Sequence, residues 1–204
     1  MSVQTLNPDS PDQPASFAFS SENMERIKEI IAKYPQGKQA SACMPLLEMA
    51  QRQHDGWLPH AAMVHVAEML EMPEIRVYEV ATFYTMYNLR PIGTYHVQIC
   101  TSLPCWLRGS DEIVARCKSA TGTEFGKTSS DGMFTMMEAE CLGACVNAPM
   151  MQIGDDFYED LSPEDVERII TALKNGQPIT PGPQNGRHSS EPAGGLTSLK
   201  EGGA

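Results

Sequence analysis

The sequence predicts a mixed α/β chain (α+β or α/β) with an N-terminal helical bundle, a second domain of alternating strands and helices, and an extended C-terminal tail. Residues 21–92 repeat apolar side chains at helical spacing. From residue 93 to residue 176, short runs of β-forming residues alternate with helical patterns. Residues 177–204 are dense in glycine, proline and serine and cannot bury a core, and the proline-containing, mostly polar residues 1–20 are expected to form a disordered or extended arm.

Four amphipathic helices are expected in the bundle. The first ends at residues 35–37, where proline and glycine stop it. The second tolerates Pro45 in its first turn and ends at residues 55–56. The third covers about residues 60–71, and the fourth begins near Pro73. Because the connections are short, neighbouring helices should pack antiparallel.

The second domain is expected to contain strands at residues 94–99, 134–138, 150–153 and 157–158. A helix over about residues 105–119 should follow the first strand. The last helix has the clearest start, because Ser162 can cap it and Pro163 suits its first position. The resulting order, β–α–β–β–β–α, is similar to a thioredoxin-like layer.

Composition and charge exclude several classes of protein. The net charge is −11, of which residues 94–175 contribute −7 through 13 acidic and six basic side chains. An acidic domain repels phosphate backbones, so no nucleic-acid partner is expected. No run approaches the roughly 18 apolar residues of a membrane span, and the first 20 residues contain no basic residue. They therefore resemble neither a secretion signal nor a transit peptide, and an intracellular protein is expected.

Four of the six cysteines fall in two close pairs. Cys100 and Cys105 have four residues between them, Cys141 and Cys145 have three, and 35 residues separate the pairs. Intracellular cysteines in close pairs indicate metal or redox chemistry rather than disulfides. Both pairs fall at predicted strand ends, where backbone amides are free to hydrogen-bond to a thiolate-ligated cluster. In the second pair, small residues of the loop, Gly143 and Ala144, are expected to let the backbone approach closely.

Three identities compete for these thiols. A [2Fe–2S] cluster takes four thiolates and is the favoured interpretation. A structural zinc ion also takes four, although its paired cysteines more often have two residues between them. A dithiol redox enzyme would need a Cys-x-x-Cys pair, which this sequence lacks.

The remaining candidate residues are expected to have structural roles. Cys43 and Cys117 should be small buried hydrophobic residues. Trp106 follows a candidate ligand, and core packing is favoured over shielding a cluster from water. His96 is the histidine closest in sequence to either pair, but four thiols leave it no vacant ligand position.

Several motifs resemble one known family. The matching runs are RVYEVATFYTMYN (76–88), CTSLPC (100–105), ECLGACVNAPM (140–150), YEDL (158–161) and GPQNGRHSSEPAGGLTSL (182–199). They resemble the family of 24 kDa [2Fe–2S] subunits of respiratory complex I, the NADH:quinone oxidoreductase. The resemblance implies a helical bundle followed by a thioredoxin-like [2Fe–2S] ferredoxin domain. It also implies that one [2Fe–2S] cluster is bound by the family's four ligands, which fall on Cys100, Cys105, Cys141 and Cys145 without a change of spacing.

The same resemblance implies a function. The chain would be an electron-transfer subunit of a proton-pumping NADH:quinone oxidoreductase, without catalytic residues or a substrate site of its own. Its cluster would exchange single electrons with FMN in the adjacent NADH-binding subunit, and a second neighbour would be an iron–sulfur subunit of the peripheral arm. FMN and NAD would then be reached only through the partner subunit, which agrees with the absence of a glycine-rich dinucleotide fingerprint from this sequence.

Location and alternatives complete these expectations. The chain should lie on the cytoplasmic side of a bacterial inner membrane, or on the matrix side of an organelle, and its tail should become ordered by docking on a partner. The small subunits of NAD-dependent formate dehydrogenases and NAD-linked hydrogenases share the cysteine motif. The run at residues 182–199 favours the respiratory enzyme.

Overall fold

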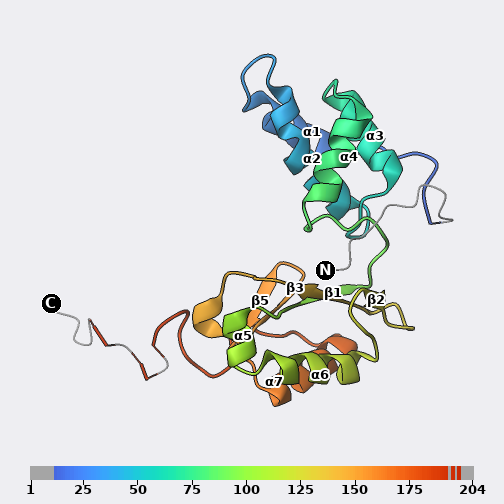
Figure 1. Cartoon of the computed structure of the whole chain (residues 1–204). Coiled ribbons are helices and arrows are strands. Elements are labelled where there is room, and N and C mark those ends of the chain that lie inside the picture. The colour runs from blue at the N-terminus through green and yellow to red at the C-terminus, as the bar shows by residue number, and fades with distance from the viewer. Residues whose placement is uncertain (1–11, 193, 196, 199–204) are drawn as a thin grey trace. The chain divides into compact units, whose positions relative to one another are not determined.

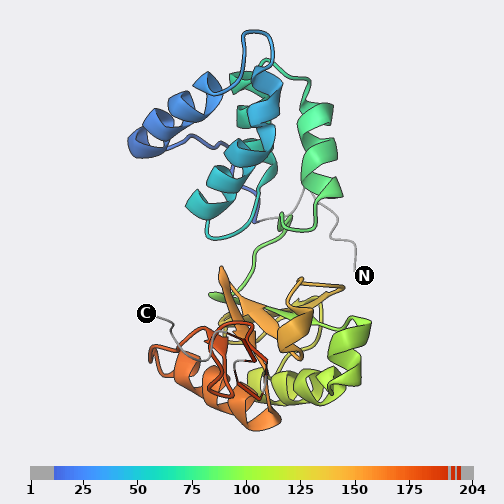
Figure 2. The same ribbon diagram turned by 90° about the vertical axis from the view of Figure 1, so that its left-hand side faces the viewer.

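Figures 1 and 2 show a computed structural model that describes residues 12–192, 194–195 and 197–198. The chain divides into two compact units, residues 1–92 and residues 93–204. Each unit has its own hydrophobic core. No helix in the described part of the chain has both the length and the apolar character required to cross a bilayer.

The first unit is a bundle of four α-helices, which confirms the four predicted ones (Figure 2). They are α1 (Ser21–Ala32), α2 (Cys43–Gln53), α3 (His60–Met69) and α4 (Glu74–Phe83), with a short 3-10 helix, η1 (Gln39–Ala42), leading into α2. The Ser20 hydroxyl accepts a hydrogen bond from the Asn23 amide and so caps α1. The helices enclose a core that includes Ile27, Leu46 and Val66.

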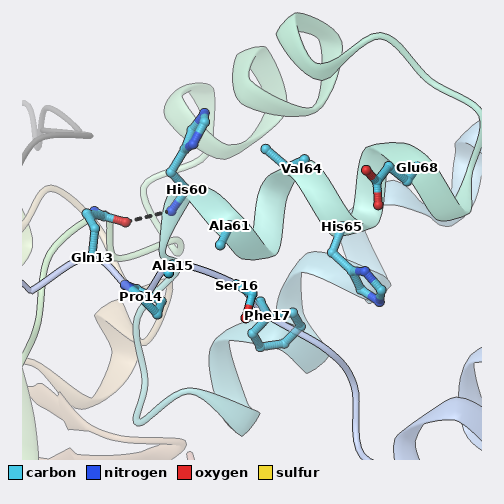
Figure 3. A pocket seen from close by; sticks show the side chains of 10 residues that line it. All are labelled: Gln13, Pro14, Ala15, Ser16, Phe17, His60, Ala61, Val64, His65 and Glu68. Atoms are coloured by element: carbon cyan, nitrogen blue, oxygen red, sulfur yellow. Dashed lines mark hydrogen bonds between the residues drawn. The ribbon is translucent and has the colours of Figure 1, made fainter.

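Residues 12–20 of the N-terminal arm form no helix or strand and pack on this bundle. The Gln53 side chain donates to the Ala18 carbonyl at 2.8 Å, and its oxygen accepts from the Ser20 amide at 2.9 Å. The arm and α3 line an open cavity of about 330 Å³, beside which Gln13 accepts a hydrogen bond from the His60 amide (Figure 3). Residues 1–11, the rest of the predicted arm, lie outside the described residues.

The second unit is built on a six-stranded sheet with the order β2-β3-β1-β4-β5-β6. The strands are β1 (Tyr95–Cys100), β2 (Lys127–Thr128), β3 (Phe134–Ala139), β4 (Met151–Ile153), β5 (Asp156–Glu159) and β6 (Gly182–Pro183). Strand β1 is parallel to β3 and antiparallel to β4, and β4 and β5 form the predicted hairpin.

Two helices, α6 (Ser110–Thr121) and α7 (Pro163–Lys174), lie side by side along one face of this sheet (Figure 1). Val97 and Ile99 alternate along β1 and are fully buried in the core that contains residues of both helices, such as Ile113 and Ile169. The predicted start of α7 is confirmed, since Ser162 and Asp165 form a capping box around it. The predicted fold class is confirmed as a whole.

The helix predicted over residues 105–119 is wrong in its start and its continuity. Two helices are present, α5 (Leu103–Leu107) and α6, and Gly109 separates them. The φ angle of Gly109 is +92°, a left-handed conformation that ends one helix before the next begins. Strands β2 and β6 were not predicted, because two residues are too few to show a period.

The C-terminal tail is extended, and its described part packs against its own domain, whereas its docking on a partner stays a prediction. Strand β6 pairs in parallel with β5, and the Gln184 amide donates to the Glu159 carbonyl at 2.9 Å. Figure 2 views the molecule from the side on which the tail lies. Proline and glycine prevent a core within the tail, but they do not prevent its backbone from extending the edge of a sheet. Residues 193, 196 and 199–204 lie outside the described part of the tail.

Candidate iron–sulfur site

The sheet topology brings the two cysteine pairs to one edge of the second unit. Strands β1 and β3 are neighbours and parallel, so their carboxyl ends lie together. Cys100 ends β1 and faces Ala139, the last residue of β3, across the ladder. The chain leaves β1 through α5, which carries Cys105, and it leaves β3 through the loop that carries Cys141 and Cys145.

The first pair is buried. Cys100 and Cys105 are 2% and 1% exposed and pack with Ala148 and Met150, beside the half-buried Leu142. The Cys100 amide donates to the Met150 carbonyl at 3.3 Å, which fixes the end of β1. The peptide bond between Ala148 and Pro149 is cis, an arrangement that the sequence left open.

Hydrogen bonds around Cys100 stabilise negative charge on its sulfur. Burial alone would raise the pKa of Cys100, but donors from the Ser102 hydroxyl and from the Leu142 and Ser102 amides outweigh it, and the net direction is downward. The Ser102 oxygen lies 3.2 Å from the Cys100 sulfur. Burial, together with the adjacent Cys100 thiol, raises the pKa of Cys105 to about 12.

The second pair is exposed. Cys141 and Cys145 lie in the loop after β3, and Cys145 begins a single 3-10 turn, η2 (Cys145–Asn147). The hydrogen bond between the two thiols raises the pKa of Cys145. Gly143 has a φ of +83°, and a Cβ atom there would meet nothing within 4 Å. The left-handed conformation by itself favours glycine here, and a close backbone approach to the cluster stays a prediction.

The donor set fits a cofactor that needs two thiolates at each of two iron atoms. Within each pair the two thiols influence each other's ionisation, since burial and the neighbouring Cys100 raise the pKa of Cys105, and Cys141 raises that of Cys145. Leu142, between the second pair of cysteines, packs against the hydrophobic cluster that contains Cys100 and Cys105 and so connects the two loops. Within the residues described here, no three cysteine, histidine or acidic side chains gather closely enough to hold a single metal ion.

Four large apolar side chains are exposed at and beside the two cysteine segments: Leu103, Trp106 and Leu107 of α5, and Val146 of η2. Trp106 is 54% exposed, and its indole N–H donates to Asp111 at 3.0 Å. The core packing predicted for Trp106 is therefore wrong. In α5 the buried side chain is Cys105, and its neighbour along the chain points away from the core.

The other two cysteines are buried as predicted. Cys43 lies in the core of the bundle and Cys117 in the core under the sheet. Burial raises the pKa of Cys43 to about 11 and that of Cys117 to about 12. Thiols of this kind remain protonated at neutral pH and behave as small hydrophobic side chains.

Sequence reasoning missed the residues that support the Cys145 loop from the tail. Arg187 pairs with Asp160 and also reaches the Val146 carbonyl, and the Asn147 amide reaches the Ser189 carbonyl. One signal was available, because Arg187 is the only arginine among residues 176–204. An arginine can equally be solvated at the surface, so the sequence does not predict its partner.

A sheet of this order with four thiols at the ends of two parallel strands defines a ferredoxin of the thioredoxin-like class. Residues 27–174 match the family model for thioredoxin-like [2Fe-2S] ferredoxins, and the chain belongs to this family. This confirms the predicted cofactor, one [2Fe–2S] cluster.

Relatives support the resemblance noted in the motifs. Over 160 residues the chain is 54% identical to an NADH-quinone oxidoreductase subunit of Rickettsia bellii (strain RML369-C), covering 78% of this chain and 96% of the relative. Over 185 residues it is 48% identical to the mitochondrial NADH dehydrogenase [ubiquinone] flavoprotein 2 of Dictyostelium discoideum, covering 91% and 75%. The resemblance to the complex I subunit family is thereby confirmed.

A solved structure shares the fold. A chain of an air-oxidized NAD+-reducing [NiFe]-hydrogenase superposes with a TM-score of 0.57 at 17% sequence identity. The match covers 65% of this chain but only 23% of the hydrogenase chain. At this identity the similarity concerns the fold alone.

Proposed function

We propose that Cys100, Cys105, Cys141 and Cys145 are the four ligands of the [2Fe–2S] cluster. The observation that supports this most directly is the pairing of the thiols, two buried and two exposed, at the aligned ends of β1 and β3. Cys43 and Cys117 belong to hydrophobic cores, where burial keeps the thiol protonated.

A [2Fe–2S] cluster accepts and releases one electron at a time. The part played by this chain is to hold the thiolates and to stabilise their charge. The Ser102 oxygen lies 3.2 Å from the Cys100 sulfur, and hydrogen bonding from Ser102 and Leu142 lowers the pKa of that thiol. Because Cys141 and Cys145 are exposed, a cluster held by them would be open to a redox partner at the protein surface.

We also propose that the chain serves as an electron-transfer subunit of a proton-pumping NADH:quinone oxidoreductase. The names and the 48–54% identity of the relatives support this assignment. In this role the cluster exchanges single electrons with FMN in an adjacent NADH-binding subunit, and a peripheral-arm iron–sulfur subunit is the second neighbour. The assembly lies on the cytoplasmic side of the bacterial inner membrane, or on the matrix side in an organelle.

The ligand assignment is tested on the anaerobically purified full chain. Iron and acid-labile sulfide should be present in equal amounts, and Cys→Ser at any of the four positions should abolish or alter the visible absorption. Cys43→Ala and Cys117→Ala are the matched controls and should keep it. Loss of the cluster in Cys117→Ala with retention in Cys141→Ala would refute the assignment.

The assignment to this complex is tested in the cell of origin with an affinity tag on the chain. The tag should retrieve an assembly that oxidises NADH and contains FMN. Adding NADH to that assembly under anaerobic conditions should reduce the flavin, and adding dithionite as well should give the EPR signal of a reduced [2Fe–2S] cluster. Retrieval of a hydrogenase or a formate dehydrogenase instead would show that the chain belongs to a different complex.

A further inference from the structure

The C-terminal tail forms hydrogen bonds with the loop that carries Cys145. We propose that Arg187 is a positioning residue, which holds the Cys145–Asn147 turn in the geometry that the cluster requires. The proposal rests on the ligand role of Cys145 proposed above. It assigns the first part of the tail a role within its own domain.

Arg187 bridges three segments of the chain. Its Nε donates to one carboxylate oxygen of Asp160 at 2.7 Å, and its Nη2 donates to the other at 2.5 Å. The same Nη2 donates to the Val146 carbonyl at 2.8 Å, and Nη1 donates to the Glu191 carbonyl at 2.8 Å. One planar guanidinium therefore ties the tail both to the residue after β5 and to the residue that follows Cys145.

Burial distinguishes this ion pair from an ordinary surface pair. The Arg187 and Asp160 side chains are 9% and 5% exposed. Arg116 of α6 and Glu167 of α7 form an ordinary surface pair in the same unit, and their side chains are 44% and 62% exposed. A buried, bidentate arginine–carboxylate pair fixes the orientation of the guanidinium plane as well as its distance from the carboxylate. Because the same Nη2 group of Arg187 donates to Asp160 and to the Val146 carbonyl, the fixed guanidinium also restrains the position of Val146.

Asn147 makes a second connection between the same segments. Its side-chain amide donates to the Glu159 carboxylate and to the Ser189 carbonyl, each at 2.9 Å. Its backbone carbonyl accepts from the Asp160 amide at 2.8 Å. Two consecutive residues after Cys145 are thus tied to the tail and to the end of β5.

The side chains of Cys145 and Val146 are not fixed by burial. Cys145 is exposed, the Val146 side chain is 67% exposed, and Gly143 upstream makes the backbone permissive. Hydrophobic burial, which fixes Cys100 and Cys105, is not available to Cys145. Hydrogen bonds from Arg187 and Asn147 restrain this turn in addition to its own backbone hydrogen bonds.

Groups that orient ligands in this way affect the cofactor directly. Their loss typically lowers metal affinity about 10- to 100-fold. In the full-length chain, Arg187→Ala should therefore release iron to a chelator about 10-fold faster or more. Its reduced cluster should also give an EPR spectrum with shifted g-values, a change that reduced folding stability alone does not produce.

The matched control is Arg168→Ala. Arg168 also contacts the tail, donating to Gln184 at 2.8 Å and to Asp165 at 2.7 Å, but it does not contact the Cys145 turn. This variant should keep the wild-type rate of iron release and the wild-type g-values. Arg187→Lys keeps the charge but not the planar fork, so it should shift the g-values in the same direction as Arg187→Ala.

The Arg187 and Cys145 variants together test the positioning role of Arg187. Wild-type iron release and g-values in Arg187→Ala would overturn the proposal, and so would equal effects of Arg187→Ala and Arg168→Ala. If Arg187→Ala does not fold, Arg187→Lys decides in its place, and a wild-type spectrum overturns the proposal. Cys145→Ser separates the two hypotheses. If the Cys145→Ser variant keeps an unchanged cluster, the ligand role of Cys145 is refuted. If its cluster is altered but the clusters of the Arg187 variants are not, only the positioning role of Arg187 is refuted.

Discussion

Cys100, the last residue of β1, is the register partner of Ala139, the last residue of the parallel strand β3. The loops after the two strands therefore begin level with one another. Because the strands run the same way, residues that are 41 positions apart, Cys100 and Cys141, emerge at the same edge of the sheet.

The cluster should have a low reduction potential. All-thiolate ligation removes the histidine ligands that raise Rieske potentials, and residues 94–175 carry a net charge of −7 that opposes an added electron. We expect a midpoint on the order of −400 mV, as in plant-type ferredoxins. A redox titration of the full chain followed by EPR measures it, and a midpoint at or above zero would contradict all-thiolate ligation.

Ser102→Ala should shift that midpoint to a more negative value. The hydroxyl lies 3.2 Å from the Cys100 sulfur, and a hydrogen bond to a ligand sulfur stabilises the more negative, reduced state. Thr101→Ala is the matched control, since the Thr101 hydroxyl donates to Glu138 instead. The same titration compares the two variants, and equal midpoints would show that the Ser102 hydroxyl does not influence the cluster.

A chain that ends at Gly176 should bind its cluster less firmly than the complete chain. The sequence alone predicts the opposite, because the tail has no core-forming pattern. The truncation removes β6, Arg187 and Ser189, and with them the ties to the Cys145 turn. A chain that ends at Pro192 keeps these contacts and should match the complete chain. Iron release to a chelator measures both, and equal rates in the two truncated chains would assign the tail to partner binding alone.

His96 should make folding stability depend on pH in the acidic range. Burial lowers the pKa of His96 to about 4, below its ordinary value of 6.5, and its Nε2 atom is buried without a hydrogen-bond partner among the described residues. The unfolded chain then binds the proton more tightly, so the contribution is complete above about pH 6.5 and is lost as the pH falls toward 4. It should amount to at most about 3.4 kcal/mol.

Urea unfolding of the wild-type chain and of His96→Gln between pH 4.5 and 7.5 measures this dependence. The difference in unfolding free energy between the two should change most steeply below pH 6.5. His60→Gln, which alters an exposed histidine, serves as the control. A difference that does not vary with pH would show that His96 titrates normally in the folded chain.

Leu46→Ala should destabilise the helical bundle and leave the cluster in place. Leu46 is fully buried in the core of the first unit, so the truncation should cost about 2 to 5 kcal/mol of unfolding free energy. Circular dichroism follows the helices during urea unfolding, and visible absorption follows the cluster. Ile75→Ala, at a position that is exposed on α4, should change neither signal appreciably. Loss of the cluster in parallel with the helices would show that the two cores unfold together.

The sequence by itself determined the secondary structure wherever a pattern was long enough to show a period. Helices α1 to α4 and α7 and the longer strands were predicted from apolar spacing and from capping residues such as Ser162. The cysteine spacing and the family motifs indicated the cofactor, and Cys100, Cys105, Cys141 and Cys145 stay predicted ligands. Local pattern suffices here because each of these signals is carried by residues that are close together in the chain.

Only the tertiary structure decided which distant segments meet. Parallel pairing of β1 with β3 places the two cysteine loops together, and spacing cannot specify which strands become neighbours. Packing between segments far apart in sequence also decides that Trp106 is exposed. It decides in the same way that Arg187 hydrogen-bonds to Asp160 and Val146. Arg187 contacts Asp160 and Val146, which are 27 and 41 residues away in the sequence. Such contacts are set by the three-dimensional fold, because the local sequence does not specify which distant residue will lie next to a side chain.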